Sequence, residues 1–478
     1  MGATSALEGG RESYAGQAWA AAYESLTVAD RADALGPQDL ELLARSAYML
    51  GRDDDYVAGL ERAHHAHLEA GDVQHAVRCA FWIGHNWLFR GETGRATGWF
   101  NRGQRLLDQS GEDSVEAGYM LIPVWLRQMA RADYEAGYAT AGRGAEIGER
   151  FGDVDLVCLA RDEQGRALVH QGRAEEGLRL VDEVLVAATA GELSPIVTGI
   201  VYCNTIAFCQ DAFELRHARE WTQALTQWCE RQPEMVAHNG LCLVHRAEIM
   251  QLRGTWTEAM KEARRAAERF TSGALNQIAC GKAFYRQGEI HRLRGELDLA
   301  ADAYREASSN GFDPQPGRAL LRLSQGDVEA AVAAIQRAIA ESPQPLQRAA
   351  LLPAYVEIML TAGDDARAVS ACRELEEIAE SSASDVLAAL SAHARGQVTL
   401  AGGDPATALG FLRQAWHSWQ ELEAPHEAAR VRVLVALACR ALGDEDTALL
   451  ELSAARSELE RLTATPDVAR VDSLMRRP

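Results

Sequence analysis

Three glutamates stand three residues before a histidine in this chain, the spacing that puts two side chains on one face of a helix. The pairs are Glu61/His64, Glu214/His217 and Glu423/His426, and His65 and His67 share the expected helix of the first pair. Di-iron bundles hold metal through this spacing, but their ligands come from four helices that meet at one point. These three pairs lie far apart along the chain. We therefore expect no metal site and no cofactor.

The sequence supports nucleophilic or acid–base catalysis as weakly as it supports a metal site. Cys203 and Cys209 are too far around a helix to share one face, and the chain has no nucleophile elbow and no glycine-rich phosphate loop. His245, Arg246 and Glu248 form the densest polar cluster on one expected helix. A general acid–base site could lie there, but a salt-bridge network between helices explains the cluster more simply. We expect a non-catalytic protein and keep open an atypical enzyme that uses an enclosed cavity.

A repeated spacing of small residues predicts the helices that position these side chains. A turn glycine is followed five residues later by a small residue and four residues further by a larger apolar one, as in Gly295, Ala300 and Tyr304. Seven residues before several turn glycines stands another small residue, at Gly84, Gly165, Gly288 and Gly396. Because helices approach closely only where side chains are small, we expect a stack of helix hairpins.

The interval between turns identifies the kind of repeat. The turn positions Gly172, Phe213, Gly254 and Gly295 are roughly 40 residues apart, longer than the tetratricopeptide period of about 34. The sequence therefore predicts an all-α fold, a tetratricopeptide-like right-handed superhelical solenoid of helix hairpins. The expected helices before the repeat becomes irregular are 11–26, 38–50, 54–70, 74–90, 94–109, 117–130, 137–151, 155–170, 174–190, 197–212, 216–231, 238–253, 256–270, 278–293 and 297–308.

Prolines interrupt this rhythm after residue 308, and a proline is incompatible with a helix interior. We expect an N-terminal repeat block at 1–308, an irregular proline-containing kink with one short repeat at 309–348, a C-terminal repeat block at 349–463 and a polar tail at 464–478. A terminal repeat of a solenoid touches only one neighbour. Removal of residues 445–478 should therefore be milder than an internal deletion.

Composition excludes several classes of function. The 478 residues include 48 basic and 69 acidic side chains, which give a formal net charge of −21. Such a charge repels phosphate backbones, so we expect no direct binding of nucleic acid. Nine cysteines occur without a CxxC pair, a usage typical of a reducing compartment. The sequence shows neither a signal peptide nor an apolar stretch long enough for a membrane span, so we expect a cytoplasmic protein that does not bind membranes.

Several segments carry a resemblance to a known family. They are 51–72, 144–153, 189–210 (TAGELSPIVTGIVYCNTIAFCQ), 219–233, 241–254 (LCLVHRAEIMQLRG) and 403–416, and the block 189–254 is the most specific. The chain resembles the helical-repeat region of large LuxR-type transcriptional regulators over nearly its whole length. The resemblance implies a sensor or interaction segment that a C-terminal DNA-binding module would follow. This chain ends where that module would begin and lacks GxxxxGK[ST], so we expect a stand-alone relative or an excised sensor fragment.

The repeat register also predicts where a ligand would bind. In tetratricopeptide-like pairs the first helix, which precedes the turn, lines the concave groove. The groove positions are His85, Asp162, Arg166, Cys203, Gln210, Glu248, Gln251, Tyr285, Glu289 and Arg292. Such a mixed polar set could clamp a peptide or a small polar ligand through charge-assisted hydrogen bonds, with Arg166, Glu248, Tyr285 and Arg292 close together. The alternative is an ordinary wet groove whose polar residues contact only water.

Two tryptophans complete the set of candidate binding residues. Trp82 and Trp228 could stack on a planar ligand or anchor a partner. The alternative is a place in the core, because Trp87 and Trp99 fall at packing positions of the repeat. We interpret the chain as a regulatory sensor or adaptor that binds a small molecule or a protein segment in its groove, with a homodimer left open. A pure scaffold that recruits a partner by its outer face remains the competing interpretation.

Overall fold

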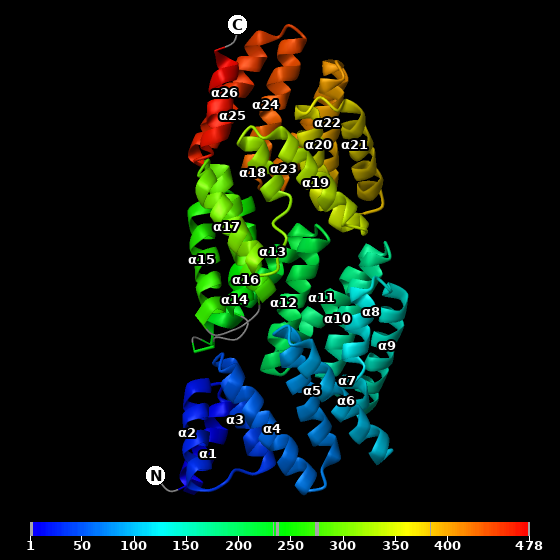
Figure 1. The fold of residues 1–478 in the computed structure, drawn as a ribbon, viewed down its shortest axis with the longest axis vertical. Coiled ribbons are helices and arrows are strands. Elements are labelled where there is room, and N and C mark those ends of the chain that lie inside the picture. The colour runs from blue at the N-terminus through cyan, green and yellow to red at the C-terminus, as the bar shows by residue number, and fades with distance from the viewer. Residues whose placement is uncertain (1–2, 233, 236–238, 273–276, 383, 477–478) are drawn as a thin grey trace. The chain divides into compact units, whose positions relative to one another are not determined.

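Every regular element of the computed structural model is an α-helix over the residues that it describes, which are 3–232, 234–235, 239–272, 277–382 and 384–476 (Figure 1). The first fifteen helices are α1 (Ala3–Ala15), α2 (Trp19–Ala32), α3 (Pro37–Met49), α4 (Asp53–Glu69), α5 (Val73–Phe89), α6 (Thr93–Ser110), α7 (Glu116–Tyr119), α8 (Ile122–Ala130), α9 (Tyr134–Phe151), α10 (Val154–His170), α11 (Ala174–Ala190), α12 (Pro195–Asp211), α13 (Leu215–Glu230), α14 (Asn239–Leu252) and α15 (Trp256–Ser272).

The remaining helices continue the same pattern. They are α16 (Gln277–Arg294), α17 (Leu297–Ser309), α18 (Gly317–Ser324), α19 (Val328–Ala340), α20 (Pro345–Thr361), α21 (Asp365–Glu380), α22 (Asp385–Ala401), α23 (Pro405–Glu421), α24 (Pro425–Ala441), α25 (Glu445–Arg461) and α26 (Thr465–Met475). Consecutive helices pack against each other as hairpins. The predicted all-α, tetratricopeptide-like solenoid of helix hairpins is confirmed. None of the described helices is both long and apolar enough to cross a lipid bilayer.

Small residues lie at the predicted contacts between paired helices. A Cβ added at Gly288 would come within 2.5 Å of the Tyr304 ring, and one added at Gly84 within 2.7 Å of the Phe100 ring. At Gly396 the added Cβ would lie 2.4 Å from Leu412. No side chain fits at these distances, so each glycine allows the larger residue of the next helix to pack against the backbone. The repeat register is therefore confirmed.

The turns between helices adopt the left-handed backbone conformation that glycine favours. Gly172, Gly254 and Gly295 have φ angles of +82°, +76° and +82°. Phe213 occupies the same slot with a φ of +61°, as the spacing predicts. The other non-glycine residues with positive φ in the described chain also precede or follow helices: Gln17, Ala132, Glu423 and Thr463.

The two helices of a hairpin are buried differently. The outer helix α23 buries a single stripe, formed by Ala408, Leu412, Ala415 and Trp419. The next helix, α24, buries nine residues distributed around several faces. A helix with one apolar stripe faces water on its other side, whereas a helix buried all round has neighbours on both sides. Helix α24 is therefore the inner helix of this pair, and its polar side chains are largely enclosed.

Two expected elements are wrong in detail. The predicted helix 11–26 is interrupted at Gly16 and Gln17, where the left-handed φ of +57° at Gln17 separates α1 from α2. The predicted helix 117–130 is two short helices, α7 and α8, and α8 has a proline in its first turn. A proline is compatible with a helix start but not with its interior, which explains the second break.

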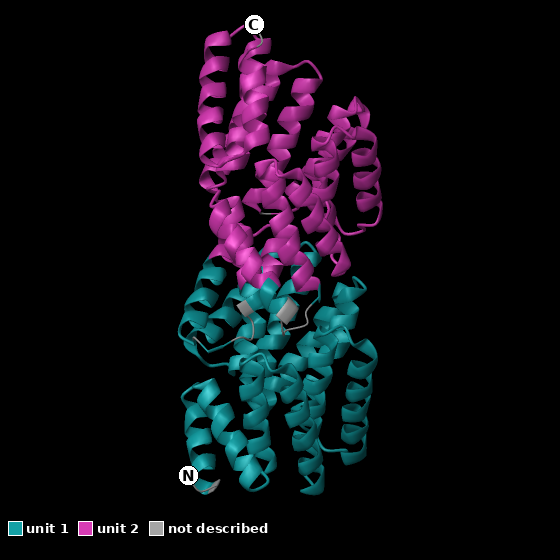
Figure 2. Ribbon diagram, turned by 60° about the vertical axis from the view of Figure 1, so that its left-hand side comes forward, with its two compact units in different colours: residues 1–206, 220–242, 268–277 teal, residues 207–219, 243–267, 278–478 magenta. Residues whose placement is uncertain are grey.

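The described chain divides into two compact units (Figure 2). Unit 1 consists of 1–206, 220–242 and 268–277, and unit 2 consists of 207–219, 243–267 and 278–478. Both expected block boundaries, after residues 308 and 348, fall inside unit 2. The segment 464–478, expected to be a polar tail, contains helix α26, whose Val471 is fully buried. The predicted tail is therefore a packed element.

Unit 2 closes on itself through contacts between its early and late hairpins. A Cβ added at Gly254 would come within 2.4 Å of Leu462, and one added at Gly295 within 3.0 Å of Pro466. The rings of Trp256 and His426 pack edge to face with centroids 5.5 Å apart. One apolar cluster joins residues of α15 and α16 with residues of α22 to α26. The last helices of unit 2 therefore have neighbours on both sides.

Candidate functional site

The predicted groove residues are divided between the two units. Unit 1 contains Trp82, His85, Asp162, Arg166, Cys203 and Trp228, and unit 2 contains Gln210, Glu248, Gln251, Tyr285, Glu289 and Arg292. The expected approach of Glu248, Tyr285 and Arg292 concerns unit 2 alone, where all three belong to one polar region. Arg166 lies in unit 1 and pairs with Glu163 at 3.0 Å. Its predicted proximity to the other three stays a prediction.

Helix α16 supplies the first part of the unit 2 site. Arg292 Nη2 donates to Glu289 Oε2 at 2.8 Å, and the Tyr304 hydroxyl of α17 donates to Glu289 Oε1. Burial would raise the pKa of Glu289, but the Arg292 charge and these hydrogen bonds lower it overall. Tyr285 is 7% exposed and lies beside Tyr304. Three of the predicted residues thus form one buried, ionised cluster.

A second ion pair connects this cluster with helix α14. Arg286 Nη2 donates to Glu248 Oε1 at 2.9 Å, and the Arg286 guanidinium lies 5.1 Å from the centre of the Tyr285 ring. The Glu248 side chain is 33% exposed, more than Glu289 at 11%. The pair therefore extends the polar surface of the inner helices from α16 to α14.

Helices α20, α24 and α26 supply the opposite part of the site. Arg430 Nη2 donates to Glu357 Oε2 at 2.7 Å, and Arg430 Nη1 lies 3.3 Å from Glu427 Oε2. His426 Nε2 is 2.9 Å from Asp467 Oδ2. Burial would lower the pKa of His426, but the Asp467 and Glu427 carboxylates raise it overall. Helices α24 and α26 are separated in sequence only by α25, whereas three helices lie between α20 and α24.

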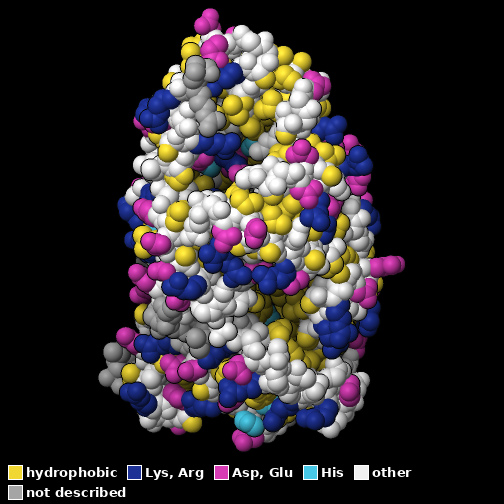
Figure 3. All heavy atoms as spheres, turned by 45° about the horizontal axis from the view of Figure 1, so that its top comes forward, with side chains coloured by type: hydrophobic (Ala, Val, Ile, Leu, Met, Phe, Trp, Pro, Cys, Tyr) yellow, Lys and Arg dark blue, Asp and Glu magenta, His cyan; other side chains and the backbone are white. Residues whose placement is uncertain are grey.

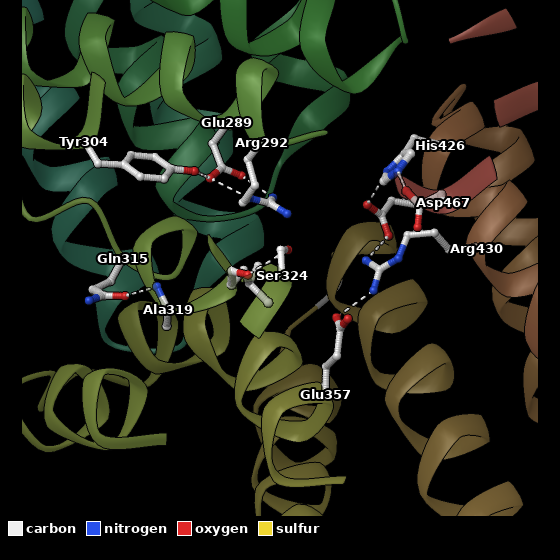
Figure 4. Close-up of polar contacts among 12 residues, drawn as sticks. Glu289, Arg292, Tyr304, Gln315, Ala319, Ser324, Glu357, His426, Arg430 and Asp467 are labelled. Carbon is white, nitrogen blue, oxygen red and sulfur yellow. Dashed lines mark hydrogen bonds and ion pairs between the residues drawn. The ribbon is translucent and has the colours of Figure 1, made fainter. Parts of the chain in front are cut away.

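We call the set Glu289, Arg292, Glu357, His426, Glu427, Arg430 and Asp467 the interior network. Figure 4 shows Glu289 and Arg292 on one side and Glu357, Arg430, His426 and Asp467 on the other, with charged ends turned toward the region between them. Burial would raise the pKa of Glu357, but the charge of Arg430 lowers it, and Arg292 and Arg470 add to this effect. The two sides therefore interact electrostatically.

The interior network is enclosed but still reached by solvent. The exposed fractions of the side chains are 15% for Arg292, 26% for Arg430 and 28% for Glu357. Figure 3 shows a hollow in the upper part of the molecule with basic, acidic and histidine side chains inside it. A charged group that entered such a hollow would meet guanidinium and carboxylate ends in a low dielectric, where ion pairs are stronger than in water.

The other two predicted residues of unit 2 differ in their contacts. Gln210 Oε1 is 2.7 Å from His245 Nδ1, whereas Gln251 accepts from the Trp256 ring only through its backbone oxygen, and its side-chain oxygen is buried with no hydrogen-bond partner among the described residues. Burial, with a contribution from Lys282 and Arg286, lowers the pKa of His245 to about 3. A neutral, enclosed imidazole is a poor acid–base catalyst near pH 7. His245, Arg246 and Glu248 each pair with a different partner, which favours the salt-bridge interpretation of this cluster.

The Glu-x-x-His pairs do not act as units. Within the described part of the chain, His217 is the one member of the three pairs that lies near its glutamate, at 3.7 Å from Glu214. Glu423 pairs with Arg219 and Arg253, at 2.8 and 2.9 Å, while His426 pairs with Asp467. The helical spacing therefore singled out His426 correctly as a paired residue, but its partner is Asp467 and not Glu423.

Sequence reasoning missed the part of the interior network on α20 to α26. Glu357 stands one residue after Val356, and Val356 stands seven before the turn residue Gly363, so Glu357 occupies the same register slot as Glu289. The same register would have identified Glu357. It does not identify His426, Glu427 and Arg430, because they lie nearer the start of α24 than the register slot does.

In unit 1 the structure brings Trp82 and His85 together, with ring centroids 5.4 Å apart, and the charge of Arg166 acts on Asp162. Asp162 is 1% exposed and accepts from the Thr205 hydroxyl at 2.9 Å. Cys203 is buried, and burial raises the pKa of its thiol. His85 lies against the Phe89 ring, and Trp228 lies near Tyr202 with ring centroids 6.1 Å apart.

Trp82 lines a cavity of about 100 Å³ in unit 1. Its other lining residues are Tyr14, Trp19, Glu41, Arg45, Met49, Tyr56, Leu60, Arg78, Cys79, Tyr119, Asp155, Ser194, Pro195 and Ile196. The cavity is smaller than the roughly 300 to 1,000 Å³ of most sites for organic ligands.

Comparisons with known proteins give little further guidance. No family model matches the chain, and no curated protein matches it. Among solved structures, the APC/C hetero-tetramer Cut9-Hcn1 is similar at 12% identity and a TM-score of 0.38, over 97% of this chain and 95% of that one. A monomeric IFIT1 mutant with m7Gppp-AAAA is similar at 12% identity and a TM-score of 0.40, over 89% and 90%. These weak likenesses carry no functional argument, and the resemblance to LuxR-type regulators stays a prediction.

Proposed function

We propose that this chain is a non-catalytic regulatory sensor or adaptor that binds a charged polar ligand at the interior network of unit 2. The ligand carries an anionic and a cationic group and is either a small molecule or a segment of a partner protein. The observation that supports this proposal is a set of paired but partly exposed charges on the inner helices, from Arg292 to Arg430.

The stacking of helices does not require these charges. Hairpins pack through small and apolar residues such as Gly288 and Tyr304. Enclosed ion pairs contribute little net stability, because the desolvation of two charges offsets most of their attraction. A guanidinium group can instead exchange its carboxylate partner for a ligand carboxylate or phosphate with the same bidentate geometry. Arg292 would accept the anionic group and Glu357 the cationic group.

A scaffold that uses its outer face has one observation in its favour. On the outer helix α25, Leu449 and Leu450 are 38% and 72% exposed. Single exposed apolar residues are normal on soluble proteins. The other exposed large apolar residues of the described chain are distributed over many helices, which makes the interior network the better candidate.

Binding can be tested on the purified full chain in two arms. Native mass spectrometry looks for a co-purifying small molecule and also gives the oligomeric state. Selection from a displayed random-peptide library on the immobilised chain looks for a bound segment. We expect a ligand in one arm, with affinity reduced at least about tenfold by Arg292→Gln and by Glu357→Gln. Thermal melts confirm that each variant is folded.

The matched control is Arg264→Ala, an exposed charge on outer helix α15, which should leave binding unchanged. If Leu450→Ser lost binding while Arg292→Gln and Glu357→Gln bound fully, the binding site would lie on the outer face. The absence of a ligand in both arms would also contradict the proposal.

A further inference from the structure

Unit 1 contains a group of potential metal ligands that is separate from the interior network. Glu41, His67 and Cys79 come from α3, α4 and α5. One ligand atom of each residue, a carboxylate oxygen, an imidazole nitrogen and the thiol sulfur, lies within 4.8 Å of the other two. All three residues are buried, at 7%, 0% and 1% exposure. Three consecutive helices thus bring three different donor atoms to one point.

The surrounding contacts orient two of these ligands. His67 Nε2 is 2.9 Å from Glu41 Oε1, while the opposite ring nitrogen, Nδ1, is 3.3 Å from Asp72 Oδ2. The second carboxylate oxygen of Glu41 accepts from Arg45 at 2.7 Å. Metal-binding histidines generally direct their other nitrogen to a carboxylate, which fixes the ring and its tautomer. Asp72 has this position relative to His67.

The donor set identifies the class of metal. Thiolate and imidazole ligands select zinc over magnesium or calcium, which prefer oxygen. Zinc sites with three protein ligands keep a fourth position for water or another small ligand. Glu41 and Cys79 both line the cavity of about 100 Å³, which is several times the roughly 10 to 15 Å³ that one water needs. The cavity therefore offers space at the fourth position.

We propose that Glu41, His67 and Cys79 bind one Zn²⁺ ion in unit 1, with the fourth coordination position open to the cavity. Binding replaces the proton of the Cys79 thiol, which passes to the solvent, and leaves a thiolate on the metal. Arg45 neutralises the outer oxygen of Glu41, and Asp72 holds the imidazole. This site was not expected from the sequence, because its ligands come from three helices and share no recognisable spacing.

The test uses the full chain after removal of metals with a chelator. Zn²⁺ is added in competition with a chromogenic chelator, and Co²⁺ is added separately as a spectroscopic probe. We expect one Zn²⁺ per chain and a near-ultraviolet band of thiolate-to-cobalt charge transfer. Cys79→Ser should abolish the band and weaken zinc binding by at least about tenfold, and Asp72→Asn should weaken it by about 10- to 100-fold.

Two controls separate this site from its surroundings. Cys158→Ser changes another buried thiol of unit 1 and should change nothing. His75→Gln tests the overlapping group His67, Asp72 and His75. The His75 side chain is 56% exposed but stacks on His67, so its loss should weaken zinc binding much less than Cys79→Ser does. Each of three results would overturn the proposal. The unmodified chain could bind less than one zinc ion, it could show no cobalt band, or its zinc binding could depend on His75 but not on Cys79. Because the cobalt spectrum is recorded on the unmodified chain, the test holds even if a variant fails to fold.

Discussion

Asp162 is an enclosed carboxyl group on inner helix α10. Burial raises its pKa to about 7, although the charge of Arg166 opposes the shift. In the unfolded chain an aspartate titrates near pH 3.9. The folded state therefore retains a proton that the unfolded state loses as the pH rises above about 4. The contribution of Asp162 to stability is greatest at low pH and falls between about pH 4 and pH 7.

We expect Asp162→Asn to remove this loss of stability at high pH. An asparagine cannot ionise, and its carbonyl can still accept from Thr205. Relative to the unmodified chain, the variant should melt at a clearly higher temperature at about pH 8, and this gain should be much smaller at about pH 5. Differential scanning calorimetry at the two pH values measures the difference. The control Asp54→Asn changes a carboxylate that is 89% exposed and should show no such pH-dependent gain.

Among the candidate residues of unit 2, the sequence predicted proximity only where the repeat register applies. Tyr285, Glu289 and Arg292 share one helix, so their proximity follows from helical periodicity. The partners Glu357 and Arg430 come from other hairpins, and the metal ligand Cys79 lies on a different helix from His67. Contacts of this kind depend on how the helices cross in space. The residue order along one helix carries no information about that crossing.

At the scale of helices, the contact of Gly288 with Tyr304 determines how closely α16 and α17 approach. The Tyr304 ring packs against the backbone of Gly288, and its hydroxyl reaches Glu289. One small residue therefore positions both a hairpin and a charged group of the interior network.

We expect Gly288→Leu to destabilise the protein by about 1 to 3 kcal/mol or more, because the new side chain overlaps the Tyr304 ring. Urea denaturation followed by circular dichroism measures the change in the free energy of unfolding. Gly410→Leu is the control in the same unit, since Gly410 lies on α23 with no atom within 4 Å of an added Cβ. Equal stability of the two variants would show that the register is wrong.

The sequence predicted most helices correctly, because hairpins depend on local spacing. It predicted the breaks between helices poorly. Gln17 has a left-handed backbone in place of the usual glycine, so no residue type signals the end of α1. The tail, 464–478, is polar in composition but forms α26 because it packs against earlier hairpins. The error at the tail comes from tertiary contacts that override local sequence signals, whereas the break at Gln17 is a local turn without the usual glycine.

At the scale of the whole molecule, the net charge of −21 predicts a protein that avoids nucleic acids. We expect no measurable binding to duplex DNA at physiological salt, since phosphate backbones would be repelled. Fluorescence anisotropy with a labelled duplex measures this. Salt-dependent binding at submicromolar concentration would contradict the prediction.

The closure of unit 2 changes what a terminal deletion should do. We expected removal of residues 445–478 to be milder than an internal deletion, because a terminal repeat touches one neighbour. In unit 2 this premise is wrong, because Leu462 and Pro466 also contact the turns at Gly254 and Gly295. A deletion at this end would expose apolar surface on the early hairpins as well.

We expect Leu462→Ala to cost about 2 to 5 kcal/mol, since Leu462 is 3% exposed and its loss leaves a cavity. Hydrogen exchange should become faster not only in α25 but also around Gly254, which is distant in sequence. The control Leu450→Ala removes a side chain that is 72% exposed and should change neither region. Faster exchange confined to α25 would show that the closure does not stabilise unit 2.

The contacts at Gly254 and Gly295 also restrict how such a protein can diverge. An open array can gain or lose a hairpin by duplication or deletion of a gene segment, because its end merely moves along the axis. In unit 2 a hairpin inserted between residues 254 and 466 would displace Leu462 and Pro466 from the turns that they contact. The number of hairpins between these contacting turns is therefore restricted. Homologous chains should differ in loop length within 254–466 and not in the number of repeats within that range.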